Sequence, residues 1–178
     1  MYNFTPKLFR SEGPGIPDLS LLKSCGTNVI IEDGVRIFHP EKISLGDNVY
    51  IGHDTILKGY YSTDIVIGSN VWIGQQCFII GAGGLTIGDY VGIGPQVKIH
   101  PCEHELEPIE IPTTFRKLFF DPITIEEDVN IGIGAMIMHG VTLRKGSLVG
   151  ANAVVKKNFP EYSVIAGVPA KLLRNRKG

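Results

Sequence analysis

Residues 122–160 read PITIEEDVNIGIGAMIMHGVTLRKGSLVGANAVVKKNFP, and the spacing of their aliphatic side chains decides the fold. Counted in sixes from Ile125, every first position is aliphatic, and the residue two places earlier is small or aliphatic. Turn-forming Gly, Asp, Asn and Lys residues lie between these positions. A period of six matches neither a helix of 3.6 residues per turn nor one long strand. It predicts very short strands that are joined by tight turns and stacked on one another, which is a parallel β-helix.

The same six-residue frame recurs upstream and gives seventeen aliphatic first positions in all. Side chains alternate along a strand, so the first position and the position two residues before it both face the core. A single unit cannot bury its apolar face, whereas many stacked units can. The sequence therefore predicts a mainly β protein with a solenoid core. The first positions are Ile31, Ile37, Leu45, Ile51, Leu57, Ile67, Ile73, Ile79, Ile87, Ile93, Ile99, Ile125, Ile131, Ile137, Leu143, Val149 and Val155.

The length of 178 residues suits a single domain with a substantial core. We interpret residues 1–28 as an N-terminal cap, in which Phe4, Leu8 and Phe9 pack on the first coil. Residues 29–160 form the β-helix, and residues 161–178 form a basic tail with a short helix near its end. A long loop at residues 100–121 interrupts the β-helix. It contains apolar side chains, which disfavours disorder, so we expect it to project and fold against a neighbouring molecule.

The charge of the chain is nearly balanced but unevenly distributed. The net charge is −1, so nothing in the overall composition indicates a nucleic-acid partner. Residues 1–143 hold 9 basic and 17 acidic residues, whereas residues 144–178 hold 8 basic and 1 acidic residue. The C-terminal part is therefore predicted to attract an anion.

The cysteines and the apolar segments predict a cytoplasmic location. Cys25, Cys77 and Cys102 are sparse and odd in number, which argues against a disulfide framework and for a reducing compartment. The N-terminal segment has no apolar stretch typical of a signal peptide. No run of about 18 apolar residues indicates a membrane-spanning helix. No membrane insertion is expected.

Several positions that should face outward are apolar. A single exposed apolar side chain means little, but a column of them marks an interface. Short stacked strands with such a column predict a homo-oligomer. The positions are Tyr50, Ile56, Trp72, Phe78, Met136, Leu148 and Val154.

Three segments carry a resemblance to a known family: the six-residue repeat, GPQVKIHPCEH at residues 94–104, and FPEYSVIAGVPAKLLR at residues 159–174. From about Ile43 to Arg174 the chain resembles the hexapeptide-repeat acyltransferases, and among them the galactoside, maltose, nodulation-factor and polysaccharide O-acetyltransferases. The resemblance implies a left-handed parallel β-helix and a homotrimer that binds acetyl-CoA between adjacent subunits. It also implies acetyl transfer to a sugar hydroxyl in glycan or polysaccharide biosynthesis.

His104 is the predicted catalytic residue. A sugar hydroxyl is a poor nucleophile at neutral pH, and an imidazole is a suitable base for it. His104 lies nine residues after Pro95, which is the spacing of the family's catalytic histidine, whereas His100 lies five residues after Pro95. Glu103 or Glu105 can orient the imidazole, and the sequence does not choose between them.

The resemblance also implies the positions that contact coenzyme A, where Lys and Arg suit its phosphates. Two of them depart from the family pattern. Ile133 stands where relatives often have a small polar residue, so only its backbone can bond, and Lys156 replaces a frequent Thr. The predicted cofactor-binding residues are Ile133, Ala151, Lys156, Lys157, Lys171 and Arg174.

The acceptor site is predicted less directly. Galactoside-type relatives place a carboxylate where this chain has GAGG at residues 81–84. This departure points away from simple galactosides. The short, Pro-rich N-terminal segment also differs from the helical one of maltose-type relatives, which favours glycan or polysaccharide substrates. Gln75, Gln76 and Glu105 are the predicted acceptor-binding residues.

Four alternatives stay open at this point. The acceptor can be the amine of an amino sugar or a nucleotide-linked amino sugar. The chain can be a non-catalytic scaffold. A zinc enzyme of the gamma-type carbonic anhydrases would use His53 and two further histidines, but Gly59 follows Lys58 where the second histidine should stand. Cys102 near His104 can suggest a nucleophilic thiol, which we interpret as a bystander because direct transfer forms no acyl-enzyme. No metal is predicted to be required.

Overall fold

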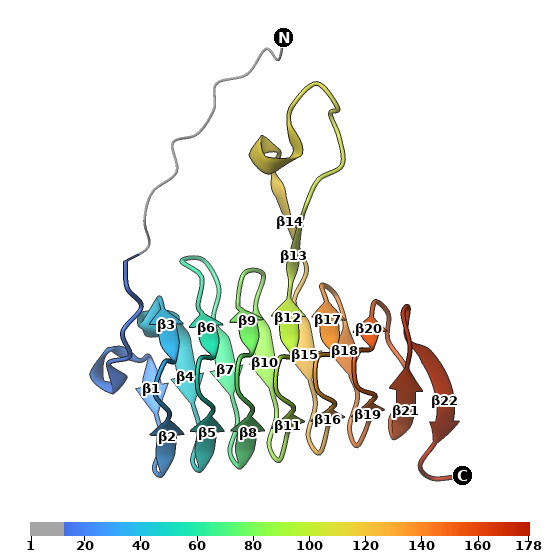
Figure 1. Cartoon of the computed structure of the whole chain (residues 1–178), viewed down its shortest axis with the longest axis horizontal. Helices are drawn as coiled ribbons and strands as arrows, with labels where there is room; N and C mark the ends of the chain where they lie inside the picture. Colours follow the sequence, from blue (N-terminus) through green and yellow to red (C-terminus); the bar gives the residue numbers. More distant parts are fainter. Residues whose placement is uncertain (1–12) are drawn as a thin grey trace.

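The structure is a computed structural model that describes residues 13–178. Its strands form three parallel sheets, called A, B and C below, which make the sides of a solenoid of about seven coils (Figure 1). The six-residue period therefore predicted the mainly β solenoid correctly. Phe4, Leu8 and Phe9, which the sequence assigns to the cap, lie outside the described residues.

Each complete coil contributes one strand to each sheet, in the order A, B, C. Sheet A contains β1 (Ser24–Cys25), β4 (Ile43–Leu45), β7 (Ile65–Ile67), β10 (Leu85–Ile87), β15 (Ile123–Ile125) and β18 (Thr142–Leu143). Sheet B contains β2 (Val29–Ile31), β5 (Val49–Ile51), β8 (Val71–Ile73), β11 (Gly92–Ile93), β16 (Asn130–Ile131), β19 (Leu148–Val149), β21 (Ser163–Ala166) and β22 (Lys171–Asn175). Sheet C contains β3 (Arg36–Phe38), β6 (Ile56–Lys58), β9 (Phe78–Ile80), β12 (Lys98–His100), β17 (Met136–Met138) and β20 (Val154–Val155).

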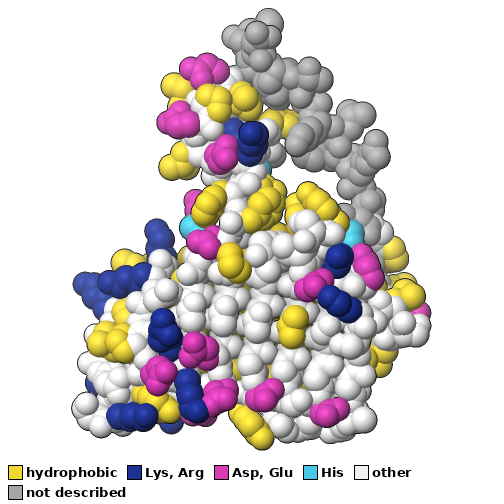
Figure 2. All heavy atoms as spheres, turned by 180° about the vertical axis from the view of Figure 1, so that it is seen from behind, with side chains coloured by type: hydrophobic (Ala, Val, Ile, Leu, Met, Phe, Trp, Pro, Cys, Tyr) yellow, Lys and Arg dark blue, Asp and Glu magenta, His cyan; other side chains and the backbone are white. Residues whose placement is uncertain are grey.

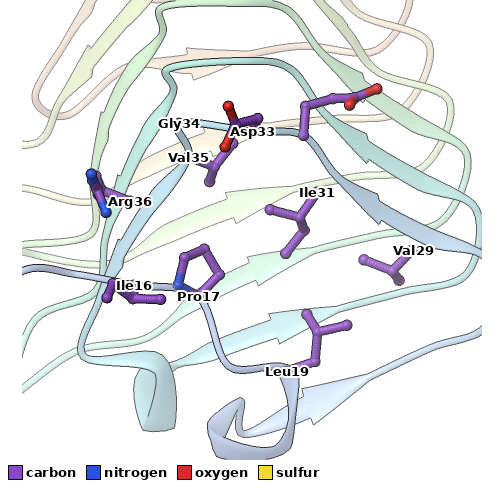
Figure 3. Close-up of a pocket in the computed structure, with 10 residues that line it drawn as sticks. Ile16, Pro17, Leu19, Val29, Ile31, Asp33, Gly34, Val35 and Arg36 are labelled. Carbon is purple, nitrogen blue, oxygen red and sulfur yellow. The ribbon is translucent and has the colours of Figure 1, made fainter.

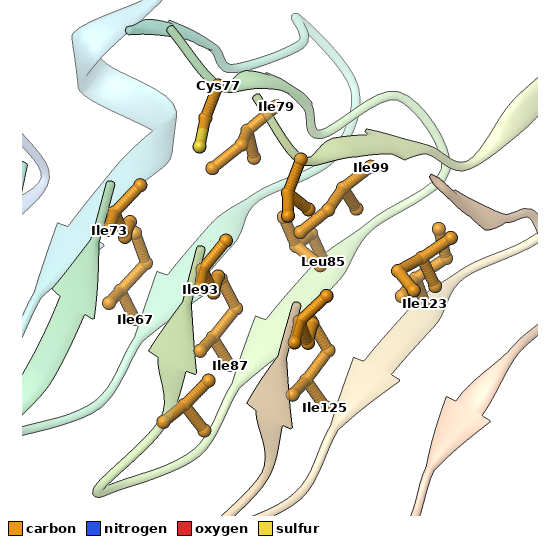
Figure 4. Packing of buried hydrophobic residues seen from close by; sticks show 14 of the residues in the cluster. Ile67, Ile73, Cys77, Ile79, Leu85, Ile87, Ile93, Ile99, Ile123 and Ile125 are labelled. Carbon is orange, nitrogen blue, oxygen red and sulfur yellow. The ribbon is translucent and has the colours of Figure 1, made fainter. Parts of the chain in front are cut away.

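The aliphatic first positions of successive coils stack directly above one another. In sheet A the register pairs Ile67 with Ile87 and Ile87 with Ile125. In sheet B it pairs Ile73 with Ile93 in the same way. All seventeen first positions are buried except Ile31, which is partly buried, and they fill the interior of the solenoid (Figure 4). Their apolar area removed from water is the main driving force for stacking.

The turns between strands need backbone conformations that most residues avoid. Asn48 and Asn70 sit in the left-handed region, with φ of 55° and 59°, which Asn tolerates better than bulkier residues. Their side-chain amides also bond from coil to coil. The Asn28 amide donates to Asn48 at 2.7 Å, and the Asn48 amide donates to Asn70 at 2.9 Å. The turn residues that punctuate the repeat therefore form a stacked column of their own.

Irregular segments leave the solenoid mostly along the edge where sheet C passes into sheet A, called the C–A edge below. The largest is residues 101–122, which rises as a two-stranded antiparallel ribbon of β13 (Cys102–His104) and β14 (Leu118–Phe120) (Figure 1). The prediction that this loop projects is confirmed. Shorter segments occupy the same edge at residues 59–64, 81–84, 139–141 and 156–162. Three short 3₁₀ turns complete the described chain: η1 (Leu19–Leu21), η2 (Pro40–Lys42) and η3 (Thr113–Phe115).

The prediction of a short C-terminal helix is wrong. Lys171–Asn175 forms β22, which pairs antiparallel with β21. The last parallel strand of a solenoid exposes unpaired backbone N–H and C=O groups, and a returning strand satisfies them. This tertiary demand outweighs the local helix propensity of Lys, Leu and Arg.

The outward apolar positions form two columns rather than one. Tyr50, Trp72 and Leu148 lie on sheet B, where Tyr50 stacks on Trp72 with ring centroids 5.9 Å apart. The others lie on sheet C. They are Ile56, Phe78, Met136 and Val154. The sequence period identifies which residues face outward, but it does not say which of the three sides each one joins.

Within residues 13–178, no helix has the length and apolar character needed to cross a membrane.

The aliphatic stack can be tested at one coil. Ile87→Ala removes a side chain that is 0% exposed and should lower the free energy of unfolding by about 2–5 kcal/mol. The adjacent outward-facing Thr86 is the matched control, because Thr86→Ala should change it by no more than about 0.5 kcal/mol. Urea unfolding at one fixed protein concentration measures both. Equal losses for the two variants would contradict the inward and outward assignment.

Candidate active site

The ribbon that carries His104 is built by cross-strand pairing at its base. The register pairs Cys102 with Phe120, Glu103 with Phe119, and His104 with Leu118. Side chains alternate along each strand, so Glu103 and Phe119 share one face of the ribbon. His104 and Phe120 belong to the opposite face. His104 ends its strand and borders the cavities on both sides of the ribbon.

Within the turn at residues 81–84, Gly83 packs closely against the base of this ribbon. Gly83 has φ of +96°, and a Cβ there would lie 3.0 Å from the Pro101 carbonyl oxygen and 3.3 Å from the Phe120 Cβ. A side chain at this position would therefore push the ribbon away. The lack of a carboxylate in this turn, noted from the sequence, accompanies close backbone packing beneath the ribbon.

The imidazole of His104 is half-buried and held by a backbone carbonyl. Its Nδ1 lies 3.3 Å from the Arg116 carbonyl oxygen. A carbonyl oxygen only accepts hydrogen bonds, so this contact requires a hydrogen on Nδ1, and in the neutral ring the lone pair then lies on Nε2. Arg116 in turn donates from Nε to the Ile111 carbonyl at 2.8 Å and from Nη1 to the Leu106 carbonyl. The loop thus positions the carbonyl that orients His104, a role that the sequence offered to Glu103 or Glu105.

Glu103 instead contacts a second histidine. His139 Nε2 lies 3.1 Å from Glu103 Oε2, and its ring packs edge-on against Phe119 with centroids 5.4 Å apart. His139 follows β17 on the next coil, at the same C–A edge. The sequence shows no histidine or carboxylate next to His139 in the chain that would indicate this contact. Its position one coil beyond the loop was the available signal.

Two cavities flank the ribbon. The first, called the acidic cavity, measures about 500 Å³ and is lined by Glu103, Glu105 and Glu107 together with His139 and apolar side chains. The second, called the aromatic cavity, measures about 390 Å³ and lies on the side of the preceding coils. Its lining includes Tyr60, Tyr61, Phe120, Arg116 and Lys117. His104 lines both cavities.

A third cavity lies at the far end of the solenoid, away from the ribbon. It measures about 550 Å³ and opens beside the first coil, where Ile16, Pro17 and Leu19 face Val29 and Ile31 (Figure 3). None of the predicted site residues lines it, and the described residues around it include no histidine or cysteine. It lies at the end of the core where Ile16, Pro17 and Leu19 approach the first coil.

The predicted cofactor-binding residues fall into two groups. Ile133 and Ala151 lie in stacked turns between sheets B and C, where the Asn152 N–H donates to the Ile133 carbonyl at 2.9 Å. Lys171 begins β22 and pairs with Ala166, near the corner between sheets B and C. Arg174 lies further along the same strand. Lys156 and Lys157 lie at the other end of β20, on the C–A edge. Within one chain, sheet C therefore separates the two groups.

Basic side chains gather over the C-terminal coils, at the left of Figure 2. This is the charge asymmetry that the sequence shows. Lys156 and Lys157 are exposed, and the Lys157 ammonium lies 5.5 Å from the centre of the Phe159 ring. On the C–A edge these lysines come after His139, which itself comes after the ribbon. The edge thus carries aromatic residues, His104, His139 and cations in coil order.

The predicted acceptor-binding residues are also divided. Gln75 and Gln76 lie in the turn between β8 and β9, across sheet C from the ribbon. The Gln96 amide donates to Gln76 Oε1 at 3.0 Å, so the side-chain oxygen of Gln76 is used in a coil-to-coil contact. Glu105 lies directly beside His104, and its N–H donates to the Lys117 carbonyl at 2.9 Å. Only Glu105 of the three lines a cavity with His104 in one chain.

The thiol of Cys102 is placed unfavourably for nucleophilic chemistry. Its side chain is buried at the base of the ribbon, and this burial raises the pKa of the Cys102 thiol. A raised pKa disfavours the reactive thiolate. All three cysteines are free. Residues 13–178 contain no group of three or more His, Cys, Asp or Glu side chains arranged to hold a metal ion.

Comparison with known proteins gives the family. A family model described as the hexapeptide repeat of succinyl-transferase matches residues 122–157. The dTDP-4-amino-4,6-dideoxy-D-glucose acyltransferase of Escherichia coli is 31% identical over 160 residues, which cover 86% of this chain and 82% of that protein. The galactoside O-acetyltransferase of Escherichia coli is 33% identical over 135 residues, which cover 74% of this chain and 63% of that protein. The chain spans from 39% to 82% of the length of several curated relatives.

A solved structure gives the same result. AntD, an N-acyltransferase from Bacillus cereus crystallised as a variant with dTDP-4-amino-4,6-dideoxyglucose and coenzyme A, superposes with a TM-score of 0.80. Its sequence is 26% identical, and the match covers 89% of this chain and 87% of AntD. The stacked coils, each built from three six-residue repeats, agree with this similarity to acyltransferases. The chain belongs to the hexapeptide-repeat acyltransferase family, whose fold is the left-handed parallel β-helix that the resemblance implied.

Proposed function

We propose that this chain transfers an acetyl group from acetyl-CoA to a hydroxyl group of a sugar, with His104 as the general base. The observation that carries this proposal is the order of groups along the C–A edge. His104 lines two cavities, its Nδ1 contacts the Arg116 carbonyl, and the Lys156 and Lys157 cations lie two coils further on. We assign the activity to glycan or polysaccharide biosynthesis in the cytoplasm.

The reaction needs one proton acceptor and one anion site. His104 Nε2 takes the proton of the acceptor hydroxyl as the oxygen attacks the thioester carbonyl carbon. The carbon–sulfur bond then breaks, and the coenzyme A thiolate recovers a proton from the imidazolium. Lys156, Lys157, Lys171 and Arg174 are proposed to bind the phosphates of coenzyme A, and Ile133 and Ala151 its pantetheine arm through their backbones. Gln75, Gln76 and Glu105 are proposed to contact the acceptor.

Transfer to an amine is the second candidate. It is favoured by the similarity to the dTDP-amino-sugar acyltransferase of Escherichia coli and to AntD. The carboxylates of the acidic cavity also suit an ammonium group. A thiol-release screen with acetyl-CoA separates the candidates. Its acceptors should include galactose, methyl galactoside, UDP-glucose and dTDP-4-amino-4,6-dideoxyglucose. Release only with the amino sugar would replace O-acetylation by N-acylation, and no release with any sugar would support a scaffold.

His104→Ala should lower turnover by about 10²- to 10⁴-fold, the usual contribution of general base catalysis. The Michaelis constant for acetyl-CoA should change little, since the cofactor is held by other coils. Only a neutral imidazole accepts a proton, so the rate should fall as the pH is lowered, and His104→Gln should lose this dependence.

His100→Ala is the control for this experiment. His100 ends β12, directly before the ribbon. The His100→Ala enzyme should keep most of the activity of the unsubstituted enzyme. Full activity of His104→Ala together with an inactive His100→Ala would show that His100, and not His104, is the base. Normal turnover of both variants would exclude histidine base catalysis.

Acetyl-CoA binding should weaken as salt is added, because cations that face phosphates are screened over about 8–10 Å at physiological ionic strength. Lys157→Ala combined with Arg174→Ala should raise the Michaelis constant for acetyl-CoA more than that for the acceptor. Steady-state kinetics at two ionic strengths measure this difference. Equal effects on the two Michaelis constants would show that the tail has a structural role and does not bind acetyl-CoA.

We propose that the protein is a homotrimer that buries the apolar columns of sheets B and C. Trp72 is 42% exposed in a single chain, and a charge placed there would be buried in the trimer at high cost. Trp72→Glu and Met136→Glu should each yield smaller species in analytical ultracentrifugation. Val66→Glu is the control, since Val66 faces outward from sheet A and is 44% exposed. An intact trimer in both interface variants would refute this arrangement.

A further inference from the structure

The loop between β6 and β7 brings two tyrosines to the active-site ribbon. In the structure the Tyr60 ring packs against Tyr61 with centroids 4.4 Å apart and against Phe120 with centroids 5.6 Å apart. Phe120 belongs to β14 and lies on the His104 face of the ribbon. Segments sixty residues apart in the sequence therefore form one aromatic cluster beside His104.

The outer rings of this cluster are unusually exposed. Tyr61 is 67% exposed and Phe120 is 40% exposed, although both are large apolar surfaces at the mouth of the aromatic cavity. Core packing does not account for a ring left mostly in water. A cluster of exposed aromatic rings at a concave site marks a binding surface.

The side of the ribbon from which acetyl-CoA approaches His104 decides which substrate the aromatic cavity receives. Lys156 and Lys157, the cations proposed for coenzyme A, lie on the C–A edge beyond His139, on the C-terminal side of the ribbon. The aromatic cavity lies on the N-terminal side. His104 lines this cavity, so an acceptor held there can present its hydroxyl or amine to the imidazole while the thioester arrives from the other side.

The chemistry of the lining indicates the acceptor class. A pyranose ring has faces of C–H groups, which carry slight positive charge and are attracted to the negative face of an aromatic ring. The described residues around the aromatic cavity include Arg116 and Lys117 and no carboxylate. Arg116 is used in holding the loop, whereas Lys117 is exposed at the rim. The acidic cavity, with three glutamates, would repel a phosphate.

We infer that the Tyr61–Tyr60–Phe120 cluster is the acceptor-binding platform, on which the pyranose ring of a sugar stacks so that its reacting group faces His104. The platform also fits a pyranose that carries a phosphate, with Lys117 facing that charge. This inference rests on the proposed acyltransferase function. It places the sugar ring in the aromatic cavity, so it replaces Gln75, Gln76 and Glu105 as the residues that hold the ring, since none of them lines that cavity.

The experiment compares Tyr61→Ala with Tyr90→Ala, using the sugar from the thiol-release panel that is turned over fastest. Tyr90 is the matched control because it is also 67% exposed but lies in a turn between sheets A and B. Tyr61→Ala should raise the Michaelis constant for the sugar by about 10-fold or more, with that for acetyl-CoA within about two-fold. Tyr61→Phe should keep near-normal values, because the ring and not the hydroxyl provides the stacking. Phe120→Leu should shift the sugar constant in the same direction as Tyr61→Ala.

The outcomes separate this inference from the proposed function. If the protein turns over no sugar in the panel, the proposed function itself is wrong. A protein that requires His104 but shows an unchanged sugar constant in Tyr61→Ala overturns the platform alone. Equal rises for sugar and acetyl-CoA would also overturn it, since they indicate a general distortion of the loop. Thermal unfolding of each variant, which should match the unsubstituted protein, identifies such distortion.

Discussion

The in-register stacking of short parallel strands constrains everything else in this molecule. Each coil must return its aliphatic first positions directly over those of the coil below, because the backbone ladder and the core both depend on that register. Ile67, Ile87 and Ile125 show the consequence, since they form one continuous stack in sheet A. An extra residue inside a strand would turn every following side chain to the wrong face. Extra residues are therefore tolerated only in the turns.

This constraint explains why the chemistry gathers on one edge. The solenoid offers flat sides of three-residue strands and corners where the chain can depart and return. The ribbon leaves β12 at the C–A edge and rejoins the solenoid at β15. The strand β15 pairs with β10 in the same register as the other coils. Segments from neighbouring coils then lie beside it at fixed spacing. His139 comes from the coil after the ribbon and Tyr61 from an earlier one, so a rigid scaffold positions side chains that stand in turns.

The sequence predicts the parts of this structure that repeat. The period of six identifies the core positions almost residue by residue, because burial imposes the same demand on each coil. It predicts little where the demand is not periodic. The pairing of β22 with β21 depends on an open sheet edge rather than on local propensity. The contacts of His139 with Glu103 and of Tyr60 with Phe120 depend on how the ribbon leans, which no spacing encodes. The proposed role of His104 comes from a family motif, and the structure adds its place beside two cavities.

The site in a single chain is open, and this links the proposed trimer to the proposed chemistry. A base that deprotonates a hydroxyl works best where water is excluded, since competing hydrolysis and dielectric screening both fall. Here His104 borders two cavities whose rims include exposed aromatic rings and exposed glutamates. Gln75, Ile133 and Ala151 lie across sheet C from it. A neighbouring copy that covers sheet C would bring its own edge against these residues. In the proposed trimer, the apolar columns would drive assembly, and assembly would bring the groups proposed for the transfer into one site.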